Sequence, residues 1–80
     1  MKVKFIFYQY SQDITIMGQD CNSILFINKG TATVTVNTVS LANNESLSLD
    51  CNVDESDNST YTLNFGTGTK ILNVIKKYNS

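Results

Sequence analysis

Thr31-Ala32-Thr33-Val34-Thr35-Val36-Asn37 decides the fold class of this 80-residue chain. Its apolar side chains stand at every second position, with threonine or asparagine between them. Successive side chains of an extended strand point to opposite faces, so Ala32, Val34 and Val36 are predicted to share one face. A strand with one apolar and one polar face is typical of an antiparallel sheet that covers a core on one side.

The same alternation of period two runs through most of the chain. It places Leu47, Leu49 and Cys51 on one predicted core face, and Tyr61, Leu63 and Phe65 on another. Turn-forming residues such as Asn28-Lys29-Gly30 and Gly66-Thr67-Gly68 separate the predicted strands. These strands are Val3–Tyr10, Asp13–Met17, Ile24–Asn28, Ala32–Asn37, Ser46–Cys51, Thr60–Phe65 and Lys70–Lys76. We therefore predict one all-β domain over residues 1–80, an antiparallel β-sandwich or small barrel of about seven short strands.

Composition argues against several functions. Charged residues make up 16% of the chain and the net charge is -1, so no basic face for nucleic acid is expected. No stretch approaches the ~20 apolar residues of a membrane helix, and the apolar run before Gln9 is too short for a signal peptide. We expect a protein made in a cytoplasm, without nucleic-acid or membrane partners.

The chain has few of the residue types that catalysis by side chains needs. The chain has no histidine to activate a serine or cysteine, and five of its seven acidic residues lie between Glu45 and Asp57 in a turn-rich region. We predict no enzyme, no catalytic residues and no cofactor.

The acidic stretch contains one motif-like feature. Asp50, Asn52 and Asp54 match the opening of a calcium-binding loop, but Glu55 stands where that loop needs glycine and Tyr61 where it needs glutamate. Turn formation explains these residues as well as a weak surface calcium site would, so no metal is predicted.

The two cysteines, Cys21 and Cys51, leave two states open. They could form a disulfide in an oxidising compartment, or remain reduced as small buried hydrophobic residues. Cytoplasmic synthesis favours the reduced state.

The first and last predicted strands differ from the others because both of their faces are apolar. In the first strand Phe5 and Phe7 share one face, whereas Ile6, Tyr8 and Tyr10 share the other. This strand is either central and buried on both sides, or it packs one face on another subunit, and a chain this short has little material to cover two faces. The predicted contact residues, including Ile75 from the last strand and Tyr78 just after it, are Phe5, Phe7, Tyr8, Tyr10, Ile75 and Tyr78.

One alternative uses the same aromatic residues differently. Tyr8, Tyr10 and Tyr78 would lie near one another if the terminal strands paired, and exposed tyrosines are a common platform for sugars. A carbohydrate- or host-surface-binding module is therefore the second prediction for function.

The segment from Asn28 to Lys77 resembles small β-rich virion proteins of tailed phages, particularly phages of Bacteroidetes. The resemblance rests on Gly30-Thr31-Ala32-Thr33-Val34-Thr35-Val36-Asn37, followed by Leu41-Ala42-Asn43-Asn44-Glu45-Ser46-Leu47. Such relatives often carry Pro-Gly in the turn where this chain has Asn43-Asn44. The resemblance implies a virion location and a role as a capsid auxiliary, decoration or head-fibre protein. We expect capsid or other virion proteins as partners, and a homo-oligomer, because the apolar strand faces and free edges can become buried against identical or capsid subunits.

Overall fold

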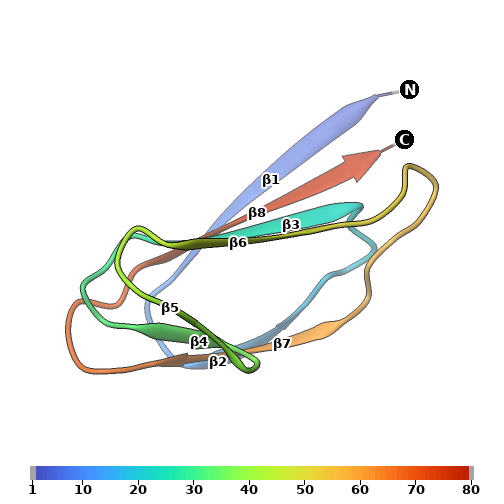
Figure 1. Cartoon of the computed structure of the whole chain (residues 1–80). Helices are drawn as coiled ribbons and strands as arrows, with labels where there is room; N and C mark the ends of the chain where they lie inside the picture. Colours follow the sequence, from blue (N-terminus) through green and yellow to red (C-terminus); the bar gives the residue numbers. More distant parts are fainter. Residues whose placement is uncertain (1, 80) are drawn as a thin grey trace.

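The strands of this protein form two layers, as the computed structural model of residues 2–79 shows (Figure 1). Within these residues there are eight strands: β1 Val3–Tyr10, β2 Ile14–Met17, β3 Ser23–Asn28, β4 Val34–Val36, β5 Val39–Leu41, β6 Ser46–Asp50, β7 Thr60–Phe65 and β8 Leu72–Asn79. The predicted all-β fold is confirmed.

The two sheets are four-stranded and antiparallel throughout. Their strand orders are β1-β8-β3-β6 and β2-β7-β4-β5. Both sheets have two open edges, so the architecture is the sandwich and not the barrel. Every connection except the β4–β5 hairpin passes from one sheet to the other, which gives the double Greek key of an eight-stranded jelly roll.

The prediction of about seven strands missed β5. The predicted strand Ala32–Asn37 is shorter in the structure, and after Val36 the chain reverses and pairs Val36 with Val39. Asn37 makes this reversal with a backbone φ of 56°, a left-handed conformation that asparagine tolerates. A strand of three residues is too short to show an alternating pattern, so it could not be recognised from the sequence.

The core lies between the sheets, where the predicted alternation places its apolar side chains. Ala32, Val34 and Val36 are buried, as are Tyr61 and Leu63. The rest of the buried apolar set is Ile16, Cys21, Ile24, Phe26, Leu41, Leu72 and Val74. In the predicted core face of β6, by contrast, Leu49 is 37% exposed, because β6 is an edge strand with a neighbour on one side only.

The first and last strands pair with each other along their whole length, from Val3 opposite Asn79 to Tyr10 opposite Leu72. Figure 1 shows their free ends running together beyond the second sheet. β1 is the outermost strand of its sheet, so the interpretation of β1 as a central strand buried on both sides is wrong. Its second apolar face is exposed.

Candidate interaction surface

The outer face of the β1-β8-β3-β6 sheet carries apolar side chains in a regular grid. The strand register places Phe7, Ile75 and Leu25 side by side in one row across β1, β8 and β3. Phe5 precedes this row on β1 and Ile27 follows it on β3, with all five side chains on the same side of the sheet. We call these five residues the outer apolar face.

Exposure is greatest at the β1 side of the outer apolar face. Phe7 is 71% exposed and Phe5 is 55% exposed, whereas Ile75, with a strand on each side, is half-buried. Single exposed apolar residues are ordinary, but adjoining aromatic and aliphatic side chains on one sheet face mark an interaction site.

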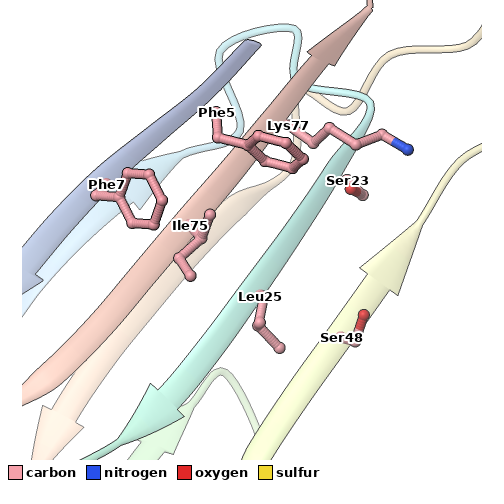
Figure 2. A pocket seen from close by; sticks show the side chains of 7 residues that line it. All are labelled: Phe5, Phe7, Ser23, Leu25, Ser48, Ile75 and Lys77. Atoms are coloured by element: carbon pink, nitrogen blue, oxygen red, sulfur yellow. The ribbon is translucent and has the colours of Figure 1, made fainter. Parts of the chain in front are cut away.

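A shallow groove of about 370 Å³ runs over this face, between β1 and β6. In Figure 2 the Phe5 ring lies over β8, and Phe7, Ile75 and Leu25 follow one another across β1, β8 and β3 as the apolar lining of the groove. Lys77 and the hydroxyls of Ser23 and Ser48 border the groove. An apolar floor with a polar rim is the arrangement found at protein interfaces.

The outer face of the second sheet has the opposite character. Thr15 lies opposite Thr62, and Thr35 lies between Asn64 and Ser40. The hydroxyls of Thr15 and Thr62 are 3.5 Å apart, and every one of these side chains can bond to water. The outer face of the second sheet is thus mainly polar, with Met17 as an exposed exception, whereas the first sheet carries the outer apolar face.

The six predicted contact residues fall into two groups. Phe5, Phe7 and Ile75 lie on the outer apolar face. Tyr8, Tyr10 and Tyr78 point inward instead, where they are partly buried against the core. The rings of Tyr8 and Tyr10 stack with their centres 6.2 Å apart and their planes 13° from parallel.

Two further residues of the outer apolar face, Leu25 and Ile27, were not among the predicted contacts. Their signal is the unbroken apolar run from Ile24 to Ile27, since a strand that is apolar at consecutive positions has two apolar faces. The same signal marks both faces of β1 as apolar.

Beside the inward tyrosines, the buried Lys76 lies at the edge of the core. Its ammonium group donates to the Met17 carbonyl at 2.6 Å and to Gln19 Oε1 at 3.1 Å, and it lies over the Tyr8 ring. Burial lowers the pKa of Lys76, although Cys21 and Asp57 act in the other direction. A cleft of about 300 Å³ between the two sheets opens here, lined by Tyr8, Tyr10, Thr15, Ile16, Met17, Gln19 and Lys76.

A second polar cluster joins Asp57 to Tyr61, whose hydroxyl donates to the Asp57 carboxylate. Burial by itself would raise the pKa of Asp57, but the hydrogen bonds from Tyr61 and Ser59 outweigh it, and the pKa lies below its usual value. Burial and the bond to Asp57 raise the pKa of Tyr61. All buried side-chain nitrogen and oxygen atoms in residues 2–79 have hydrogen-bond partners, so the cluster is satisfied internally.

Both cysteines are free thiols in the structure, with Cys21 buried and Cys51 half-buried. Burial and the nearby charge of Asp57 raise the pKa of the Cys21 thiol. A raised pKa keeps a thiol protonated and therefore a weak nucleophile.

The calcium candidates lie where β6 ends. Asp50 is the last residue of β6, and Asn52 and Asp54 follow in an exposed turn that Glu55 closes by accepting the Asn52 backbone N–H at 2.9 Å. In the part of the chain that the structure describes, no three His, Cys, Asp or Glu side chains group closely enough to hold a metal ion.

No family model, curated protein or solved structure matches this chain. Across residues 2–79, no helix is long and apolar enough to cross a membrane.

Proposed function

We propose that this protein is a virion structural component, a capsid auxiliary, decoration or head-fibre protein that binds other virion subunits through its outer apolar face. The observation that carries this proposal is the exposure of Phe7 beside Ile75 and Leu25. Apolar area in contact with water has a free-energy cost of about 25 cal/mol per Å², which a bound subunit would remove.

The contrast between the two outer faces supports a fixed orientation in an assembly. The apolar sheet would lie against the partner, and the sheet that carries Thr15, Thr62 and Asn64 would face water. Adjoining exposed apolar side chains on one side mark that side as the place of attachment.

Fold and resemblance agree with this role. Jelly rolls form viral capsid and lectin domains, although a fold by itself does not determine a function. The segment from Asn28 to Lys77 adds the resemblance to small virion proteins of tailed phages. Lys77 and the serine hydroxyls at the rim would give the interface its polar border.

Two observations test the virion location. The gene is expected among capsid, portal and tail genes of a phage genome. Mass spectrometry of purified virions of the phage that carries the gene should detect the protein. Absence of the protein from virions would contradict the proposal.

The contact surface can be tested with matched variants. Phe7→Lys should weaken binding to capsids that lack the protein by about tenfold or more, because one large apolar side chain no longer becomes buried. The control Thr62→Lys adds the same charge to the opposite face and should bind like the unmodified protein. Equal loss in both variants, or in neither, would show that the outer apolar face is not the contact.

The cleft between the sheets favours a second candidate function, binding of a carbohydrate. Its lining combines the aromatic rings of Tyr8 and Tyr10 with hydrogen-bonding groups from Thr15 and Gln19. Under this alternative the monomer should bind on a glycan array, and Tyr10→Ala should abolish that binding. A monomer without glycan binding would leave only the structural role.

A further inference from the structure

The free edge of β1 is the longest unpaired strand edge in the described part of the molecule. β1 has eight residues, whereas the other three edge strands, β6, β2 and β5, have five, four and three. Its register with β8 continues without a break from Val3 to Tyr10, so no bulge turns the edge away. Short length, bulges, proline and charged side chains are the usual protection of sheet edges. β1 has none of the first three, and its one charged residue, Lys4, lies near its beginning, which leaves the edge from Phe5 to Tyr10 without a charge.

The exposure of the two phenylalanines follows from this open edge. Ile75 lies on the same face as Phe5 and Phe7 but has a strand on each side and is half-buried. Phe5 and Phe7 have a neighbour on one side only, and they remain 55% and 71% exposed. A strand added at the edge of β1 would cover the open sides of both rings.

We propose that this strand is β1 of a second copy, paired antiparallel about a two-fold axis into a continuous eight-stranded sheet. The inference rests on the proposed function and names one of its partners. It makes the dimer, with a doubled outer apolar face, the unit that contacts the virion.

Symmetry and side-chain direction limit the register of this pairing. Residues directly opposite in an antiparallel pair lie on the same face, so a two-fold axis normal to the sheet passes beside one residue and its own copy. With the axis at Ile6, Phe5 lies opposite Phe7 of the second copy, and Phe7 opposite its Phe5. With the axis at Phe7, the Phe5 rings would instead face the polar Gln9. Paired aromatic side chains on neighbouring strands stabilise a sheet, so the axis at Ile6 is the one we infer.

The charges of β1 agree with that register. Lys4 is the one charged residue of β1. With the axis at Ile6 it lies opposite Tyr8 of the second copy, and the two Lys4 residues are four positions apart along the sheet. This is about 13 Å at the usual rise per residue, longer than the Debye length of about 8 Å at physiological salt. The pairing therefore brings no like charges together.

Sedimentation of charge variants tests both the dimer and its register. The unmodified 8.9 kDa chain should sediment as a dimer. Phe5→Lys with Phe7→Lys puts lysine opposite lysine twice and should give a monomer. Phe5→Lys with Phe7→Glu puts lysine opposite glutamate twice and should restore the dimer. Thr60→Lys with Thr62→Lys, on the outer face of β7, is the control and should remain dimeric.

Each contrary outcome overturns the inference. If the chain is monomeric at every concentration, the free edge of β1 does not pair with a second copy, and a strand of a different protein would have to cover it. A dimer that survives Phe5→Lys with Phe7→Lys uses another surface. Loss of the dimer in Phe5→Lys with Phe7→Glu excludes the register centred on Ile6. Circular dichroism checks that each variant is folded, and substitutions at exposed positions should leave the fold intact. Detection of the protein in virions is independent of these results, so a failed dimer and a failed virion role can be told apart.

Discussion

The ammonium group of Lys76 lies 4.8 Å from the ring centre of Tyr8, inside the sandwich. Lys76 is 1% exposed and occupies a core-facing position of β8, in line with Leu72 and Val74. Its hydrogen bond to the Met17 carbonyl connects the two sheets at the end of β2. The core therefore includes one cation held by a carbonyl, an amide and an aromatic ring.

Replacement of this cation should change how stability depends on pH. The pKa of Lys76 is lowered by burial in the folded state, whereas the unfolded lysine keeps its usual value of about 10.5. Between these two pKa values the unfolded chain binds more protons, so the Lys76 contribution to the free energy of unfolding rises with pH. Urea unfolding from pH 7 to pH 10 should therefore show unmodified protein gaining stability relative to Lys76→Met as pH rises.

The control for this experiment is Lys70→Met, which removes the same charge from an exposed position before β8. The difference from the unmodified protein should change more with pH for Lys76→Met than for Lys70→Met. Equal changes in the two variants would mean that the burial of Lys76 does not perturb its protonation.

Lys76 also illustrates what the sequence could and could not predict. The alternation of Ala32, Val34 and Val36 predicted their core face correctly, because side-chain direction in a strand has a fixed period, although the strand itself covers only Val34–Val36. The same period places residue 76 in the core, but an isolated pattern cannot show that Met17 and Gln19, almost sixty residues earlier, supply its hydrogen bonds. Pairing of the first and last strands was the condition under which the sequence predicts that Tyr8, Tyr10 and Tyr78 lie near one another, and β1 does pair with β8. The inward direction of Tyr8, Tyr10 and Tyr78 depends on which face of the first sheet the second sheet covers. Contacts between residues far apart in the sequence decide this, and a local pattern does not show them.

Loss of the Tyr61 hydroxyl should destabilise the protein over a defined pH range. Tyr61→Phe removes the hydrogen bond to the Asp57 carboxylate, and bonds to charged groups contribute about 1.5–3 kcal/mol. The pKa of Asp57 is lowered on folding, so this stability is present above about pH 3.8 and is lost as pH falls below it. The pKa of Tyr61 is raised, so stability is also lost as pH rises above about 10.

Chemical denaturation across pH should thus show a plateau. The difference between Tyr61→Phe and the unmodified protein should be constant from pH 5 to pH 9 and should narrow on both sides. A difference that keeps the same value at pH 2.5 would show that Asp57 is not the partner that matters.

Asn28 holds three backbone segments together from a fully buried position. Its amide nitrogen donates to the Ala32 carbonyl at 2.8 Å and to the Leu41 carbonyl at 2.9 Å, and its amide oxygen accepts the Gly30 N–H at 3.0 Å. Asn28→Ala removes the side-chain donor from the buried Ala32 and Leu41 carbonyls, whereas the Gly30 N–H keeps its bond to the Ile71 carbonyl. At about 1–3 kcal/mol for each buried group that loses its partner, we expect a loss of about 2 kcal/mol or more. Thermal unfolding measures it.

Asn28→Asp separates the amide's hydrogen bonding from its size. The substitution keeps the shape but turns a carboxylate oxygen toward the carbonyls of Ala32 and Leu41. Neutral pH should therefore destabilise this variant strongly, and acidification should restore part of the loss because a protonated carboxyl donates one hydrogen bond. Unfolding that does not depend on pH would contradict this account of the site.

Replacement of glycine by alanine should change the stability of the protein in opposite directions at Gly30 and at Gly66, because the backbone lies much closer to Gly30. A Cβ atom at Gly30 would lie 2.1 Å from the Thr69 carbonyl oxygen and 2.8 Å from the Ile71 nitrogen, so the segment before β8 would have to move. That movement would strain the Gly30 N–H bond to the Ile71 carbonyl and the neighbouring Ala32 N–H bond to the Thr69 carbonyl. Gly30→Ala should cost about 3 kcal/mol, at the upper end of overpacking losses, since backbone cannot rotate away as a side chain can.

At Gly66 the nearest atom would be 3.5 Å from the new Cβ, an ordinary contact. Gly66→Ala should therefore stabilise the protein by about 0.4–1 kcal/mol, through the lower entropy of its unfolded chain. Differential scanning calorimetry should show a lower melting temperature for Gly30→Ala and a higher one for Gly66→Ala. Shifts of the same sign would contradict the close contact between Gly30 and the Thr69 carbonyl oxygen.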